Sequence, residues 1–153
     1  MVSLRLLNLW LHLLAASIWI GASVSLTFLW LPQFRARTDP ATWDELILSL
    51  GRRYLRWAWL AIQILLLTGI FNLLSVGMES GFALPPAFLK RLIAKLFIVS
   101  VMVGVQIGLS VAWVPRLARG PSGKEAERAV CRALIATGVG GGVVVWLALM
   151  LGR

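Results

Sequence analysis

Four long segments without a charged side chain constrain this sequence more than any other feature. The uncharged segments are residues 6–34, 57–78, 96–115 and 133–152, and each holds at least 20 residues. An α-helix rises about 1.5 Å per residue, so ~20 residues cross the ~30 Å hydrocarbon core of a bilayer. The sequence therefore predicts an all-α fold, an integral membrane four-helix bundle. We expect the spans at about 5–31, 57–77, 91–115 and 130–151.

The composition leaves no room for a soluble domain beside these spans. The chain has 153 residues, of which 59% are hydrophobic and 14% charged, whereas soluble domains carry about 25% charged residues. We expect a single membrane domain, residues 1–153, with the lipid bilayer as its partner. The net charge of +9 does not indicate nucleic acid, because the cations lie in loops beside the spans, where anionic lipid attracts them.

The distribution of Lys and Arg predicts the orientation of the spans. With four spans, both termini lie on one side, and the loops at 32–56 and 116–132 lie on the other. These two loops hold ten of the 15 Lys and Arg residues, against five on the side of the termini. Because cytoplasmic loops are enriched in Lys and Arg, we expect the two loops to be cytoplasmic and both termini to be outside.

Residues 40–56 of the first loop are expected to form a cytoplasmic amphipathic helix. Asp39 can cap this helix, with Pro40 at its first position. The apolar residues then recur at spacings of three and four, as on one face of a helix. They are Trp43, Ile47, Leu50, Tyr54 and Trp57. This helix either lies on the membrane surface or leads into the second span.

His12, the only histidine, is the first candidate for a functional residue. Ionisable residues inside a membrane are costly and commonly functional. The topology brings His12, Asn72 and Lys95 to a similar depth in the outer half of the bilayer. These residues either form a site together, or His12 bonds a neighbouring hydroxyl such as Ser100 while Lys95 extends to the surface.

Cations gather where the third span begins. Arg91 and Lys95 share a helix face at i, i+4, with Lys90 beside them. Cations are disfavoured near the N-terminus of a helix, and like charges at this spacing repel. An anion should therefore compensate them. The candidates are lipid phosphate, Glu79, or a bound anion such as a haem propionate or a substrate carboxylate.

Two methionines fall on the same side as His12 and are candidate copper ligands. Met78 ends the second span and Met150 ends the fourth. Thioether and imidazole groups both suit copper. The sequence therefore suggests a copper site made by His12 with Met78 and Met150, although methionine also fills gaps in apolar cores.

Two glutamines are the main polar groups in the inner half of the spans. Gln63 in the second span and Gln106 in the third lie at comparable depth. Amide side chains hydrogen-bond between membrane helices, each bond contributing about 0.6–2 kcal/mol. We therefore expect the two glutamines to join helices rather than to do chemistry.

The fourth span is rich in glycine. Gly138, Gly140, Gly141 and Gly142 allow backbones to approach closely, and small residues are what membrane helices use to pack. The glycines either form a tight contact within the bundle, or form a homo-oligomer interface through Gly138, Gly141 and Gly142, or provide a flat wall for a planar cofactor.

The spans contain no catalytic constellation of a familiar kind. No span holds a carboxylate, which argues against a proton-driven transporter that relies on buried acids. The chain has one histidine with no nearby acid, and neither a zinc motif nor a phosphate-binding loop. Enzymatic activity is therefore left open, and a non-catalytic role is favoured.

Short motifs in three of the spans carry a resemblance to a known family. The motifs are His12 followed by Trp19-Ile-Gly21, then Thr68-Gly69 with Asn72, then Lys95 entering the third span. In these residues the chain resembles the four-helix membrane domain of the copper-resistance D type, over nearly its whole length. The resemblance implies a bacterial inner-membrane protein that handles copper at its outer face, with His12 as a ligand.

The same pattern is similar to the bacterial four-helix, haem-dependent protoporphyrinogen oxidase. That resemblance implies haem b, with His12 as axial ligand and Lys95 or Arg91 holding a propionate. The family also carries a histidine about three turns after the lysine, where this chain has Gln106, so a second imidazole ligand is absent. The hypotheses are therefore copper handling, a haem b redox protein, or a non-catalytic accessory subunit of a larger membrane complex.

Overall fold

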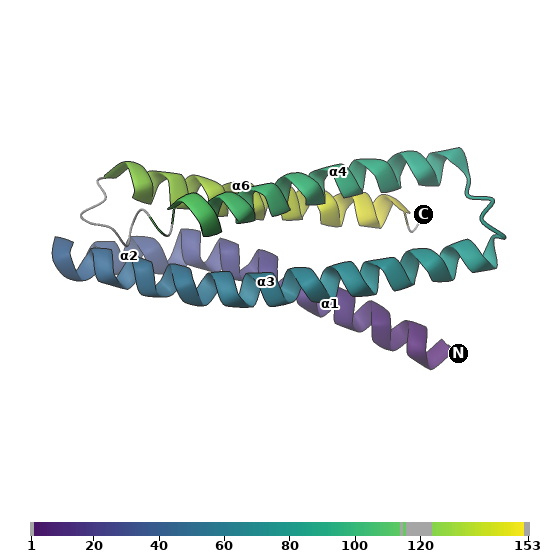
Figure 1. Cartoon of the computed structure of the whole chain (residues 1–153), viewed down its shortest axis with the longest axis horizontal. Helices are drawn as coiled ribbons and strands as arrows, with labels where there is room; N and C mark the ends of the chain where they lie inside the picture. Colours follow the sequence, from purple (N-terminus) through teal and green to yellow (C-terminus); the bar gives the residue numbers. More distant parts are fainter. Residues whose placement is uncertain (1, 114, 116–123, 152–153) are drawn as a thin grey trace.

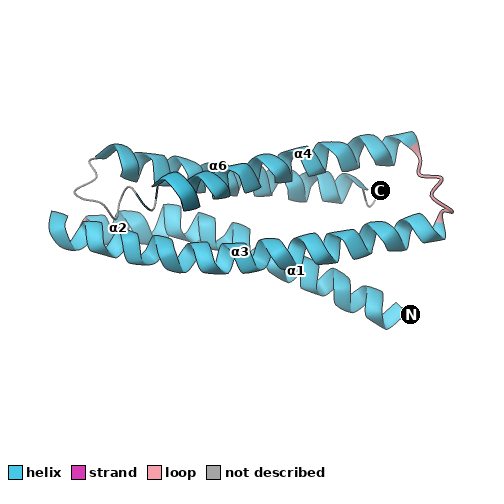
Figure 2. Ribbon diagram, in the orientation of Figure 1, coloured by secondary structure: helices cyan, strands magenta, loops and turns pink. Residues whose placement is uncertain are grey.

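The computed structural model describes residues 2–113, 115 and 124–151, and every regular element within them is helical (Figure 2). The elements are α1 (Val2–Ser25), η1 (Leu26–Trp30), α2 (Leu31–Arg35), α3 (Pro40–Glu79), α4 (Pro86–Gly108), η2 (Leu109–Trp113) and α6 (Lys124–Leu151), where η marks a π-helical segment. The expected all-α class is confirmed.

Four helical stretches are long and apolar enough to cross a membrane, as predicted. They are Leu4–Arg35, Glu45–Glu79, Pro86–Val111 and Arg128–Leu147. Large apolar side chains on these stretches face outward, including Trp10, Leu67 and Phe97 at 65–70% exposure. An isolated soluble protein rarely exposes so much continuous apolar surface, so the helices are suited to lipid.

The helices pack as two pairs that meet through α1. α1 lies along α3 and also along α6, and α4 lies along α6. α3 and α4 follow one another in the chain but share little direct contact over their described lengths. The start of α1 and the end of α6 lie at the same end of the molecule (Figure 1), here called the terminal end, and α3 begins at the opposite end.

The glycines of α6 are contact points within the chain. A Cβ added at Gly141 would lie 2.6 Å from Ile20 of α1, and one at Gly138 would lie 3.0 Å from Val24 of the same helix. A Cβ at Gly140 would meet Met102 of α4 at 2.9 Å. A Cβ at Gly142 would meet nothing within 4 Å. Of the three glycines expected at a homo-oligomer interface, Gly142 alone therefore faces open space.

α3 is one helix of 40 residues, about 60 Å long at 1.5 Å per residue. Asp39 caps it as predicted, since its Oδ2 accepts a hydrogen bond of 3.0 Å from the backbone N–H of Thr42. The segment expected at 40–56 is continuous with the second span. Trp43, Ile47 and Tyr54 of its apolar stripe are buried against the other helices, whereas Trp57 is exposed.

A Schellman motif ends α3 at the terminal end. Gly81 adopts φ +59°, and the N–H of Phe82 bonds the carbonyl of Gly77 at 2.8 Å. The Phe82 ring lies over Gly77, where an added Cβ would be 2.6 Å from the ring. The left-handed conformation favours glycine because a Cβ there crowds the following carbonyl. The turn sends the chain into α4, which starts at Pro86.

Both π-helical segments end two residues before a proline. η1 ends at Trp30 before Pro32, and η2 ends at Trp113 before Pro115. Proline lacks an N–H and its ring clashes with the carbonyl four residues earlier in an α-helix. A wider π turn accommodates that clash without breaking the helix. The first span consequently continues without interruption to Arg35, beyond its expected end near residue 31.

Candidate functional site

A cluster of polar side chains joins α1 to α3 in the half of the molecule toward the terminal end. We call it the His12 site: Asn8, His12, Thr68 and Asn72, with Lys95 of α4 nearby. His12 is half-buried, and its Nδ1 lies 2.8 Å from Oγ1 of Thr68. Ser100, which the sequence offered as an example of a neighbouring hydroxyl for His12, donates instead to the carbonyl of Leu96 in its own helix.

The hydrogen bonds of Thr68 determine which nitrogen of His12 carries the proton. Thr68 Oγ1 donates to the carbonyl of Ile64 at 2.6 Å. A threonine hydroxyl has one proton, so it must accept from His12, whose Nδ1 is therefore the protonated nitrogen. In the neutral ring, Nε2 then holds a lone pair. Metal-binding histidines in proteins are oriented in this way, with the second ring nitrogen hydrogen-bonded to a protein oxygen.

Asn8 holds the two helices together one turn further toward the terminal end. Its Nδ2 donates to the backbone carbonyl of Thr68 at 3.0 Å and to Oδ1 of Asn72 at 2.8 Å. Asn8 precedes His12 by four residues, and Thr68 precedes Asn72 by four, so each pair lies on one helix face. The sequence reasoning missed Asn8, although its spacing from His12 could have indicated it.

Gly69 lies against the imidazole ring. A Cβ added there would be 3.5 Å from Cε1 of His12, an ordinary van der Waals contact. The glycine in the Thr68-Gly69 pair therefore lets the ring lie close to the backbone of α3. A side chain larger than alanine at this position would crowd the atom that separates the two ring nitrogens.

Lys95 brings a third helix to the site. Its side chain is half-buried and interacts electrostatically with His12. The structure thus places His12 and Asn72 in one hydrogen-bonded cluster through Asn8 and Thr68, with the ammonium of Lys95 within electrostatic range. A cation in this position can pair with an anionic group of a bound ligand.

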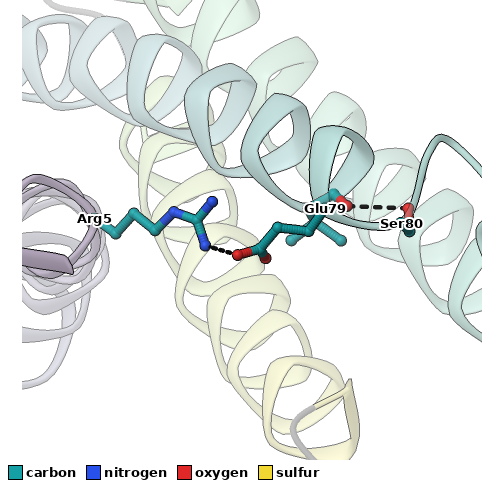
Figure 3. A network of polar contacts seen from close by, with 4 residues as sticks. Arg5, Glu79 and Ser80 are labelled. Atoms are coloured by element: carbon teal, nitrogen blue, oxygen red, sulfur yellow. Dashed lines mark hydrogen bonds and ion pairs between the residues drawn. The ribbon is translucent and has the colours of Figure 1, made fainter. Parts of the chain in front are cut away.

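Two other cations at the terminal end, Arg5 and Arg91, have protein partners. Arg5 of α1 and Glu79 of α3 point toward each other and form an ion pair (Figure 3). Both side chains are exposed, so the pair adds at most about 1 kcal/mol. Glu79 thus compensates Arg5 rather than the cations of α4.

Arg91 of α4 hydrogen-bonds the C-terminal end of α6. Its Nε donates to the carbonyl of Ala87 at 3.2 Å, and its NH1 group donates to the carbonyl of Met150. The last carbonyls of a helix lack partners within the helix and carry its negative dipole end. The C-terminal turn of α6 therefore supplies part of the negative charge that the sequence required beside Arg91.

The two methionines expected as ligands lie further toward the terminal end than His12. Met78 is ten residues beyond Thr68 on α3, about 15 Å along the helix axis, and its side chain is 67% exposed. Met150 lies level with Arg91, one turn beyond Lys95. Among the described residues, no group of three or more His, Cys, Asp or Glu side chains could hold a metal ion. His12 is therefore the one ligand of the expected set placed in this cluster.

A second polar cluster lies deeper, in the half toward the opposite end. The Tyr54 hydroxyl of α3 lies 2.9 Å from Oγ of Ser23 in α1 and 3.1 Å from the side-chain amide of Gln106 in α4. Gln106 is fully buried, and its amide nitrogen has no partner among the described residues. Gln106 thus joins helices, as expected, but through Tyr54, while Gln63 is exposed.

Comparisons with protein-family models, with curated proteins and with solved structures each find no match. The class of this protein therefore rests on its own features. It is an α-helical protein with four candidate membrane-spanning helices and a histidine-centred polar cluster between the first two of them.

Proposed function

We propose that this chain is a membrane protein of the copper-resistance D type that handles copper, with Nε2 of His12 as the ligand. One observation carries the proposal: Nδ1 of His12 lies 2.8 Å from the Thr68 hydroxyl, which donates to the carbonyl of Ile64 and so must accept a hydrogen bond from His12. This arrangement fixes the ring and leaves the lone pair of Nε2 available to a metal ion. Imidazole nitrogen is a suitable ligand for copper. The motifs around His12, Thr68 and Lys95 support the same family.

The proposed site has few ligands, which suits transfer rather than storage. His12 supplies one imidazole, and the neighbouring Asn8 and Asn72 supply amide groups that bond each other. The proposal does not need Met78 and Met150, whose positions are further toward the terminal end. A copper ion held by one strong ligand passes readily to a partner that offers more ligands, as transport or delivery of copper requires.

The proposed orientation places the His12 site in the outer half of the membrane. Its support is the excess of Lys and Arg in residues 32–56 and 116–132, the two loops expected to be cytoplasmic. The membrane would be the inner membrane of a bacterium, with both termini outside and the helices packed as a four-helix bundle. Copper would then reach His12 from the outer side.

Copper retention tests the proposal. Detergent-purified protein is loaded with Cu(I) under reducing conditions, desalted, and its copper is counted by elemental analysis. We expect about one copper per chain for the wild type and none for His12→Ala. Thr68→Val should weaken binding about 10- to 100-fold, the usual effect of losing the partner that orients a ligating histidine.

The matched control is Ser100→Ala, which also removes a hydroxyl from a span. Ser100 is exposed and bonds a carbonyl of its own helix, so its loss should leave copper retention unchanged. The proposal is wrong if the wild type retains no copper after desalting, or if His12→Ala retains as much as the wild type.

Lys95 favours a second candidate, a haem b membrane protein. The ammonium beside His12 opposes a bare cation but complements the carboxylates of a haem. The residues could supply one axial ligand to haem iron. Nε2 of His12 is free to bind the iron, and the Nδ1–H of the same ring has the oxygen partner typical of such ligands. Lys95 would hold a propionate. Gln106 carries an amide in place of a second imidazole, and its oxygen accepts a hydrogen bond from Tyr54. Bound haem would supply one-electron chemistry.

A reduced-minus-oxidised absorption spectrum separates the two candidates. Protein expressed with adequate haem supply should show a Soret shift and an α band under the haem hypothesis, and His12→Ala should abolish both. A flat spectrum together with copper retention supports copper handling. Haem absorption that survives in His12→Ala would contradict the assignment of His12 as the axial ligand.

A further inference from the structure

A groove with mainly apolar walls and a few polar side chains lies between α3 and η2. It has a volume of about 450 Å³ and is lined by Leu55, Arg56, Trp59, Leu60, Gln63 and Ser110. Trp59 Nε1 donates to Oγ of Ser110 at 3.0 Å, and Ser110 donates to the carbonyl of Gln106 at 2.8 Å. The first bond links α3 to η2, and the second lies within the continuous stretch of α4 and η2; together they satisfy the indole N–H and the hydroxyl.

Gln63 is the unusual residue of this groove. It lies within the candidate span Glu45–Glu79, seven residues inside the uncharged run that begins after Arg56. Its side chain is exposed, and its amide makes no hydrogen bond to the described residues. An amide in hydrocarbon is costly unless it is hydrogen-bonded. A hydrogen-bonding molecule in the groove would remove that cost.

Arg56 supplies the charge at the mouth of the groove. Its side chain is exposed, and no carboxylate among the described residues pairs with it. Arg56 and Gln63 are separated by two helical turns and so lie on the same face of α3, about 10 Å apart along its axis. Both side chains are flexible enough to reach toward one another along the groove.

We propose that the groove binds one anionic phospholipid. The phosphate would bond the guanidinium of Arg56, and an ester carbonyl below it would accept from the Gln63 amide. An acyl chain would follow Leu55 and Leu60. Along the groove, Arg56 comes first, then Trp59, and then Gln63 among apolar side chains. This order suits a lipid whose phosphate lies at Arg56 and whose ester carbonyl lies below it at Gln63.

Native mass spectrometry can measure this binding. The protein is released from nanodiscs of phosphatidylglycerol and phosphatidylcholine, and the number of retained lipids of each kind is counted. We expect one retained phosphatidylglycerol on the wild type. Arg56→Gln should lower its retention roughly fivefold, which corresponds to about 1 kcal/mol for one cation near anionic lipid. Gln63→Leu should lower it as well, without changing the charge.

Arg53→Gln is the matched control. Arg53 is exposed on the same helix and carries the same charge, but it does not line the groove. Its loss should leave phosphatidylglycerol retention unchanged. Equal losses in Arg53→Gln and Arg56→Gln would show general surface attraction and overturn the proposal, as would equal retention of both lipids by the wild type. Retention unaffected by Gln63→Leu would overturn the two-point binding.

Discussion

Gly141→Ala is the sharpest test of how α1 and α6 pack. A Cβ at position 141 would lie 2.6, 2.7 and 2.8 Å from Cγ1, Cδ1 and Cγ2 of Ile20, whereas carbon atoms prefer about 3.5–4.0 Å. Two of these atoms are attached directly to the branched Cβ of Ile20, whose χ1 is restricted in a helix. Rotating the end of the side chain cannot relieve the clash, so the helices must separate.

The expected cost can be isolated with Gly142→Ala. Overpacking of this kind costs about 1–3 kcal/mol. Glycine to alanine in a helix also gains up to about 1 kcal/mol from propensity. Gly142 is in the same helix and has nothing within 4 Å of its added Cβ, so that variant shows the propensity gain alone. The difference in unfolding free energy between the two variants should therefore be about 1–3 kcal/mol.

Reversible SDS unfolding of the purified protein, followed by circular dichroism, would measure this difference. The double variant Gly141→Ala with Ile20→Ala should recover much of the loss caused by Gly141→Ala, since the added methyl group then occupies vacated space. Coupling energies between contacting residues are about 0.5–3 kcal/mol. If Gly141→Ala is as stable as Gly142→Ala, the close contact between α1 and α6 is wrong.

Three further changes in unfolding free energy are expected, each measurable by the same SDS titration. Tyr54→Phe should cost about 0.6–1.7 kcal/mol, the range for hydrogen bonds between membrane helices. Gln106→Leu should cost less, because it also removes an amide nitrogen that has no partner among the described residues. The reverse order of these two costs would contradict the Tyr54 network. Gly81→Ala should cost about 1–2 kcal/mol because of its positive φ, and no loss would contradict the Schellman turn. Asp39→Ala should cost about 1 kcal/mol through loss of the helix cap, whereas Asp39→Asn should retain most of it.

The existence of the four helices followed from the sequence because it depends on local features. Charge-free runs of 20 residues or more admit few alternatives. The cap at Asp39 was equally local, since the acid and Pro40 are adjacent. The sequence also allowed the prediction that α3 is one continuous helix, because no proline interrupts the chain between Pro40 and Pro85.

The composition of the His12 site depended on helix rotation, which a single sequence does not provide. His12 stood out as the one ionisable group deep in the first span, but depth alone suggested Ser100 as an example of its hydroxyl partner and did not point to Thr68. Only the rotation of α1 against α3 selects Thr68. The same rotation brings Asn8 onto Asn72, a contact that the spacing of four residues permitted but did not require.

The role of the α6 glycines also depended on three-dimensional packing. Four small residues in one span are compatible with an internal contact and with an external one. The structure directs Gly138 and Gly141 to α1 and Gly140 to α4. Their spacing in the sequence did not distinguish these neighbours from those in a second chain.

Nitrogen NMR of the imidazole ring tests the central claim most directly. The chain has one histidine, so protein labelled with ¹⁵N-histidine gives one pair of ring resonances that needs no assignment to a residue. The account predicts a neutral ring protonated on Nδ1, and a shift of the Nε2 resonance when Cu(I) is added. A ring protonated on Nε2, or resonances unchanged by Cu(I), would contradict the account of His12 as an oriented copper ligand.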